Sequence, residues 1–161
     1  SFHCWASVVN GLKLSVDLNH GFGMSEGLGG ANTKDDVLPA EEQSYTQVRD
    51  RNNKWRRYFS DVYTIEGNSM ASETIEKVKS RLNGKKVDWI FIDAWHEYFA
   101  AMEDLNNFKQ FLSADGYIGF HDIHQSSSMD KFWSEVQNTY THTIEISGGT
   151  GIGLIHASSF I

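Results

Sequence analysis

Short apolar runs alternate with amphipathic stretches along much of this chain. The run Val87–Ile92 is almost wholly apolar and ends at Asp93, which is typical of a strand buried on both faces. Residues 117–120 repeat the pattern and end at His121 and Asp122. We expect both runs to be strands of one sheet.

Apolar residues between these runs recur at helical spacing. One stripe predicts a helix that continues through Leu112, since it comprises Ala101, Leu105, Phe108 and Leu112. A second amphipathic helix is predicted from Met129, Phe132, Trp133, Val136 and Tyr140. A third stripe covers 71–82, and the preceding Gly67, Asn68 and Ser69 are expected to form a turn and a helix cap.

The remaining segments complete an alternating order of strands and helices. Residues 11–17 alternate apolar and polar positions and end at Asp17, while 62–66 are β-branched and aromatic, so both predict strands. Between them we expect a long loop over 18–40 and a helix over 42–59. The final strands, 143–146 and 152–155, are joined by a short glycine-rich turn and should pair antiparallel.

This order predicts one α/β domain over residues 1–161. We expect a Rossmann-like, doubly wound and mostly parallel sheet with helices on both faces and a C-terminal antiparallel strand pair. Ligands of such sheets bind beyond the carboxyl ends of the strands. Asp17, Asp93 and Asp122 each stand at such an end, so we expect the functional site there.

Composition and charge exclude several classes of binding partner. The chain has 161 residues and a formal net charge of −7, which argues against a general nucleic-acid binder. No apolar run reaches the roughly 18 residues of a membrane span, and the single Cys4 allows no internal disulfide. We therefore expect a cytoplasmic protein that acts on a small molecule, without nucleic acid or membrane as a partner.

The strand ends carry the candidate chemistry. His96 follows Asp93 by three residues and could serve as a general base, because imidazole titrates near neutral pH. Asp93 with His121, Asp122 and His124 could hold a hard cation such as Mg²⁺. With His96, the same residues could instead form a two-histidine, one-carboxylate site for iron or zinc.

These motifs resemble a known family. Ile92-Asp93-x-x-His96, the segment 115–123 with its His121-Asp122 pair, Lys131-Phe132-Trp133 and the closing segment 151–155 are similar to the class I S-adenosylmethionine-dependent methyltransferases. The most similar branch contains sugar O-methyltransferases and the proteins called cephalosporin hydroxylases. The resemblance implies methyl transfer from S-adenosylmethionine to a sugar or similar small-molecule hydroxyl, with Mg²⁺ as the assisting cation.

The resemblance also implies roles for particular residues. Asp17 would bind the ribose hydroxyls of the donor, and Gly67, Asn68 and Ser69 would lie near its adenine. Asp93 would lie between donor and acceptor and would bind a cation together with Asp122 and, at the adjacent position, His121. His96 would be the base or would orient the acceptor.

The chain departs from the family pattern at three places. Ala94 and Trp95 replace a Gly-Asp pair, and His121 stands where metal-dependent relatives often have an acid. The family's first strand and glycine loop should precede Ser1, so we expect an N-terminally incomplete domain, and an apolar truncated edge would favour a homodimer. Two rival functions follow: a metal-dependent hydrolase or oxygenase that uses His96, His121, Asp122 and His124, and a degenerate, non-catalytic methyltransferase-like binding domain.

Overall fold

The computed structural model describes residues 12–17 and 62–160, and the chain divides into two compact units, Ser1–Thr74 and Ile75–Ile161. In the first unit, β1 (Lys13–Asp17) pairs in parallel with β2 (Val62–Glu66), in a register that sets Asp17 opposite Glu66. Both predicted strands are therefore confirmed. The loop expected over 18–40 and the helix expected over 42–59 lie outside the described residues.

A turn follows β2, as the sequence predicts. The Asn68 side-chain oxygen accepts a hydrogen bond from the Met70 backbone N–H at 3.0 Å, and the Asn68 carbonyl accepts one from Ala71. Helix α3 (Ser72–Leu82) begins only after this turn. The prediction of a helix cap at residues 67–69 was wrong, because Asn68 closes its own turn first.

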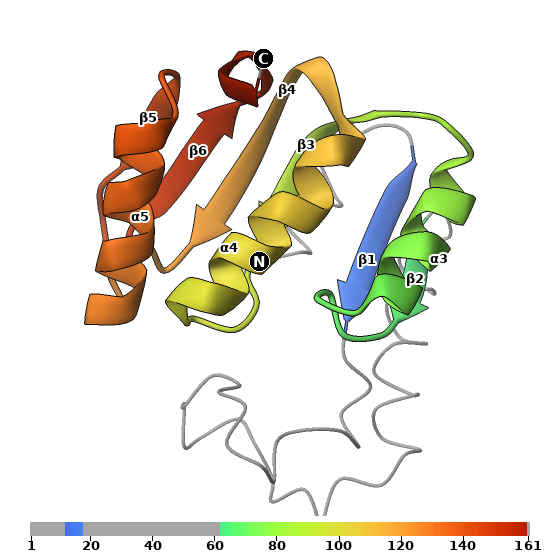
Figure 1. Ribbon diagram of the computed structural model, residues 1–161, viewed down its shortest axis with the longest axis horizontal. Coiled ribbons are helices and arrows are strands. Elements are labelled where there is room, and N and C mark those ends of the chain that lie inside the picture. Colours follow the sequence, from blue (N-terminus) through green and yellow to red (C-terminus); the bar gives the residue numbers. More distant parts are fainter. Residues whose placement is uncertain (1–11, 18–61, 161) are drawn as a thin grey trace, which may run out of the picture. The chain divides into compact units, whose positions relative to one another are not determined.

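The second unit is a four-stranded sheet in the order β3-β4-β6-β5 (Figure 1). β3 and β4 are parallel, while β6 pairs antiparallel with both β4 and β5, as expected for the end of the chain. The strands are β3 (Val87–Ile92), β4 (Leu112–His121), β5 (Thr143–Ile146) and β6 (Ile152–His156). The sequence therefore predicted the direction of strand pairing correctly, including the final antiparallel pair.

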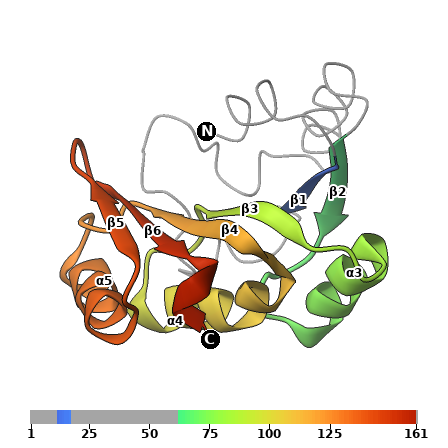
Figure 2. The same ribbon diagram turned by 90° about the horizontal axis from the view of Figure 1, so that it is seen from above.

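Two helices of this unit lie over one face of the sheet (Figures 1 and 2). They are α4 (Tyr98–Phe108) and α5 (Ser127–Thr139). A short 3₁₀ turn follows α4 at Lys109–Phe111, and another follows β6 at Ala157–Phe160. The side chains of β3 are partly exposed and Asp88 is fully exposed, so the expectation of a strand buried on both faces was wrong. β3 is an edge strand of this sheet, which explains the exposure.

The helical stripe ending at Leu112 was predicted too long. Helix α4 stops at Phe108, a 3₁₀ turn covers Lys109–Phe111, and Leu112 begins β4 as a buried residue. A buried side chain is needed at this position in either structure, so hydrophobic spacing alone could not locate the helix end.

The core lies between the two helices and the sheet. Its most deeply buried side chains come from α4, α5, β4, β6 and the β4–α5 loop, and include Leu105, Ile118, Phe120, Ile123, Phe132, Trp133 and Ile155. Trp133, the largest of them, is 1% exposed and packs on the backbone of β6 at Gly153. Within the described residues, no helix is long and apolar enough to cross a membrane.

Gly153 is required by this packing. A Cβ at Gly153 would lie within 2.7 Å of three carbons of the Trp133 ring, far inside van der Waals contact. We expect Gly153→Ala to lower the free energy of unfolding by about 1–3 kcal/mol, because the indole must leave its place in the core. Urea unfolding of both proteins measures the difference.

A double-mutant cycle separates this clash from a general effect of alanine in a strand. The ring carbons that would clash belong to the six-membered ring of Trp133, which Trp133→Phe removes. Gly153→Ala should therefore cost clearly less in the Trp133→Phe background. Equal costs in the two backgrounds would contradict the packing argument.

Candidate functional site

The parallel pairing of β3 with β4 brings the predicted chemistry to one edge of the sheet. The register sets Ile92 opposite Phe120, so Asp93 and His121, the next residues on the two strands, leave the sheet side by side. His96 lies in the loop between β3 and α4, and Asp122 directly follows β4. We call these four residues, Asp93, His96, His121 and Asp122, the strand-end cluster.

The ligand-type atoms of the cluster converge. One side-chain nitrogen or oxygen from each of the four residues lies within 4.8 Å of the others. His96 Nε2 is 3.1 Å from Asp122 Oδ2 and 3.6 Å from Asp93 Oδ1. His121 Nδ1 is 3.0 Å from Asp122 Oδ1 and 3.5 Å from Asp93 Oδ1. The structure thus brings together Asp93, His96, His121 and Asp122, four of the five residues predicted for catalysis or metal binding at these strand ends.

The backbone conformation at Asp122 lets the side chains of the adjacent His121 and Asp122 lie on the same side of the chain. Side chains of consecutive strand residues point to opposite faces, which argues against their joint use. β4 ends at His121, however, and Asp122 has a φ of +58°, in the left-handed region. Aspartate tolerates this conformation better than most residues. The turn is closed by a 3.0 Å hydrogen bond from the Gln125 N–H to the Asp122 carbonyl.

A residue that sequence reasoning missed supports Asp122. The Thr150 hydroxyl, in the turn between β5 and β6, donates a hydrogen bond to Asp122 Oδ1. The Thr150 carbonyl accepts a 2.8 Å hydrogen bond from the His124 N–H, which fixes the same turn against the β4–α5 loop. The only sequence signal was a threonine among the glycines of that turn.

The cluster is partly shielded from water. The side chains of His96 and Asp122 are 15% and 13% exposed, whereas those of Asp93 and His121 are about one-third exposed. Two carboxylates this close repel each other, so a positive charge between them would be stabilising. That charge can come from protonated imidazole or from a bound cation.

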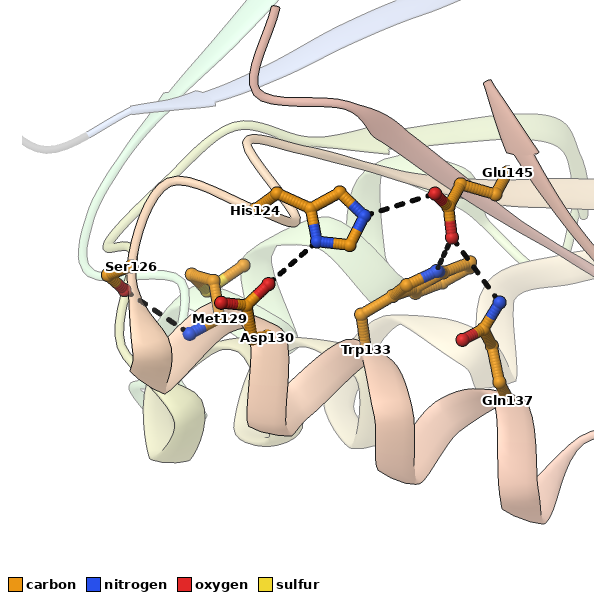
Figure 3. A network of polar contacts seen from close by, with 7 residues as sticks. All are labelled: His124, Ser126, Met129, Asp130, Trp133, Gln137 and Glu145. Carbon is orange, nitrogen blue, oxygen red and sulfur yellow. Dashed lines mark hydrogen bonds and ion pairs between the residues drawn. The ribbon is translucent and has the colours of Figure 1, made fainter. Parts of the chain in front are cut away.

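His124 does not belong to the cluster. Figure 3 shows its ring between two carboxylates, with Nδ1 2.7 Å from Asp130 and Nε2 3.1 Å from Glu145. Glu145 also accepts a 2.9 Å hydrogen bond from the Trp133 indole N–H. The predicted metal sets that included His124 are therefore not brought together by the structure, in which Asp93 lies with His96, His121 and Asp122 instead.

The hydrogen bonds of this second network shift the pKa values of His124 and Glu145. The hydrogen bond with Asp130, followed by that with Glu145, raises the pKa of His124 above its usual value. The hydrogen bonds from His124 and then Trp133 lower the pKa of Glu145. These hydrogen bonds thus favour the protonated form of His124, which joins the β4–α5 loop, α5 and β5.

The predicted donor-binding residues lie at the corresponding edge of the first unit. Asp17 ends β1 opposite Glu66, so it stands beside the start of the turn formed by Gly67, Asn68 and Ser69. Gly67 approaches the buried Thr74 so closely that any Cβ would overlap the threonine hydroxyl. The two chain segments predicted to bind the nucleoside are therefore neighbours at the carboxyl ends of a parallel pair.

Trp95 lies between Asp93 and His96 in the sequence and has an aromatic partner. Its ring meets that of Phe99, in the first turn of α4, edge to face with centroids 4.7 Å apart. Phe99 is 53% exposed, which is unusual for a phenylalanine. Trp95 and Phe99 thus place two aromatic side chains shortly after Asp93 in the chain.

A parallel α/β arrangement with carboxylates and histidines past its strand ends is typical of enzymes that bind small ligands at this edge. Residues 1–123 match the family model described as "Methyltransferase domain". The chain belongs to this methyltransferase-domain family, as its motifs predict. No curated protein matches the chain in sequence.

Solved structures share the fold. The O-methyltransferase NovP superposes with a TM-score of 0.56 at 12% identity, over 93% of this chain and 61% of NovP. A Staphylococcus aureus protein assigned as a caffeoyl-CoA O-methyltransferase gives 0.51 at 21% identity, over 70% and 59% of the two chains. MycE, a methyltransferase of the mycinamycin pathway solved with Mg, SAH and mycinamycin VI, gives 0.50 at 10% identity, over 96% and 47%. The chain thus spans between about half and two thirds of the lengths of these three proteins.

The His124 network predicts how stability depends on pH. A raised folded pKa means that the His124 contribution is fully present below its unfolded value, about 6.5, and is lost as pH rises through the folded pKa. The lowered pKa of Glu145 means that its contribution is present above its unfolded value, about 4.3, and is lost as pH falls through the folded pKa. Replacing His124 with glutamine should therefore lower Tm most near pH 5–6 and least at alkaline pH.

Thermal melts of wild type and His124→Gln across this range measure the effect. His142→Gln is a matched control, because the His142 ring contacts the hydroxyl groups of Thr141 and Ser158 rather than carboxylates. A Tm difference for His124→Gln that is constant with pH would show that its ion pairs do not stabilise the fold.

Proposed function

We propose that this protein is an S-adenosylmethionine-dependent O-methyltransferase whose acceptor is a sugar or another small-molecule hydroxyl. The observation that carries this proposal is the strand-end cluster, two histidines and two carboxylates whose ligand-type atoms lie within 4.8 Å of one another at the carboxyl ends of the strands of a methyltransferase-family sheet. Membership of the family supports the donor, and the structures similar in fold include O-methyltransferases.

We assign the donor's nucleoside to the first unit. An aspartate at a strand end can accept hydrogen bonds from both hydroxyls of a ribose, and Asp17 has that position. Gly67, Asn68 and Ser69 form the neighbouring turn and are assigned to the adenine. Asn68 presents an exposed side chain there, although its oxygen already accepts the Met70 N–H. Asp93 is assigned to the donor as well as to the cation.

Proton removal is assigned to His96. In methyl transfer, the acceptor oxygen forms a bond to the methyl carbon while the carbon–sulfur bond breaks and its electron pair stays on sulfur. The hydroxyl proton must leave the oxygen, and imidazole is the side chain best matched to take it near neutral pH. The two carboxylates near His96 Nε2, from Asp93 and Asp122, stabilise the imidazolium that forms.

The cluster also fits a divalent cation. His96 Nε2 and His121 Nδ1 are buried and make no hydrogen bond, although carboxylate oxygens lie 3.0–3.1 Å away. Asp93, His121 and Asp122 would hold the ion, as the resemblance implies, and a cation would lower the pKa of a coordinated hydroxyl. MycE was solved with Mg and SAH, which supports metal assistance within this fold.

The acceptor is assigned to the surface near Trp95 and Phe99. Phe99 is exposed and Trp95 half-buried, so this pair offers an aromatic contact for a ring, which suits the less polar face of a sugar. We propose no nucleic acid or membrane as partner, in line with the net charge of −7. The cytoplasmic location and the homodimer stay predictions.

Donor binding is the first test. Titration calorimetry of the chain with S-adenosylhomocysteine should detect binding, and Asp17→Asn should weaken it about tenfold or more, because an amide accepts fewer hydrogen bonds from the diol. Asp115→Asn, at an exposed acid within β4, is the matched control and should bind as wild type does. Wild-type protein that binds neither donor nor product would support the degenerate domain instead.

His96 tests the chemical step. His96→Gln should reduce the methyl-transfer rate roughly 10²–10⁴-fold, the usual contribution of a general base, while donor affinity stays near the wild-type value. Rates are measured with labelled donor and a panel of sugar and phenolic hydroxyls. A variant with normal turnover would remove His96 from the proton-transfer role.

A further inference from the structure

We infer that the strand-end cluster selects a first-row transition cation, such as Co²⁺, Ni²⁺ or Zn²⁺, over Mg²⁺, and that His121 sets this preference. This inference rests on the cation site of the proposed function but not on methyl transfer itself. It revises the expected Mg²⁺ on the basis of the donor atoms that the cluster offers.

The two ring nitrogens that face the carboxylates lie close to them without forming hydrogen bonds. His121 Nδ1 is 3.0 Å from Asp122 Oδ1, a distance at which a well-directed N–H would form a hydrogen bond. It forms none, and neither does His96 Nε2 at 3.1 Å from Asp122 Oδ2, although both nitrogens are buried. The carboxylate oxygens therefore lie beside the ring nitrogens without the alignment of an N–H···O hydrogen bond. Such side-by-side placement is expected of atoms that face a common centre.

The separations suit a coordination shell. Around an ion with ligands at about 2.1 Å, neighbouring ligand atoms lie about 3.0 Å apart and opposite ones about 4.2 Å apart in an octahedron. The measured nitrogen–oxygen distances are 3.0–3.6 Å, and all four ligand atoms lie within 4.8 Å of one another. Only small side-chain shifts would close this shell.

The donor atoms decide which ion is preferred. Mg²⁺ favours an all-oxygen environment and keeps several waters, whereas imidazole suits zinc, iron, nickel and copper. Here His121 supplies a second nitrogen beside that of His96, at the end of β4, where a carboxylate would have left only one nitrogen in the set. Even if His96 is reserved for proton transfer, Asp93, His121 and Asp122 form a one-nitrogen, two-carboxylate set.

Neighbouring residues hold His121 and Asp122 in place for this role. The His121 ring lies against Phe91 of β3, with centroids 6.1 Å apart, and Thr150 donates a hydrogen bond to Asp122 Oδ1. Outer contacts of this kind fix the orientation of ligands and typically change metal affinity 10–100-fold when removed.

Cobalt provides a direct test that needs no enzymatic activity. The purified chain, stripped of metal with a chelator, is titrated with Co²⁺ while visible ligand-field absorption is recorded, and Mg²⁺ and Zn²⁺ are added as competitors. We expect Zn²⁺ to displace Co²⁺ near stoichiometry, and Mg²⁺ to need at least about a hundredfold excess. Displacement by equimolar Mg²⁺, or no cobalt absorption at all, would overturn the inference.

Variants locate the effect at His121. His121→Glu should weaken Co²⁺ binding at least about tenfold and strengthen Mg²⁺ binding, and His121→Gln should weaken Co²⁺ without the gain for Mg²⁺. His142→Glu makes the same change at an exposed histidine outside the cluster and should leave both affinities unchanged. Circular dichroism shows that each variant is folded. Equal behaviour of His121→Glu and His142→Glu would overturn the assignment.

The design separates this inference from the proposed function. Calorimetry with S-adenosylhomocysteine on the same preparation reports donor binding independently of cobalt. Donor binding with no preference for Co²⁺ over Mg²⁺ would reject the metal inference and leave the methyltransferase proposal standing. Tight Co²⁺ binding without donor binding would do the reverse.

Discussion

The parallel pairing of β3 with β4 is the constraint on which the rest of the candidate site depends. Two strands that run the same way and are aligned at Ile92 and Phe120 must release their next residues at one edge of the sheet. Core packing stabilises that alignment, because α4 and α5 pack their buried side chains against the same face of the sheet and bury Ile118 and Phe120. The placement of the functional groups at the edge therefore depends on core packing along one face of the same strands.

The two charged clusters differ in what holds them together. Around His124, both ring nitrogens make hydrogen bonds to carboxylates, those of Asp130 and Glu145, and the pKa of the histidine is raised. Around His121, similar distances occur without hydrogen bonds. Two histidines three residues apart thus have different surroundings: His124 makes hydrogen bonds that join three elements of the fold, whereas His121 Nδ1 lies among carboxylates without one.

The sequence predicted most strands of the described residues and the four residues of the strand-end cluster, because hydrophobic runs that end in acids mark strand ends directly. The prediction failed where the type of a residue does not determine its secondary structure or the partners of its side chain. Leu112 is buried in a helix or in a strand, so its place in β4 was missed. His124 has the right chemistry for a ligand, but its position depends on Asp130 and Glu145, which come from other elements. The support of Asp122 by Thr150 spans 28 positions of the chain, and no local pattern announces it.

The Thr150 hydrogen bond gives the β5–β6 turn a role in the energetics of the edge. Asp122 Oδ1 is shared between the threonine hydroxyl and whatever the cluster holds, so a ligand that draws on this oxygen changes the strength with which the turn is held. Thermodynamic linkage makes the relation mutual: a substrate or partner that shifts the turn alters the affinity of the cluster by the same factor. The glycines at 148, 149 and 151, all at positive φ, let this short segment adopt the conformation that places Thr150 against Asp122.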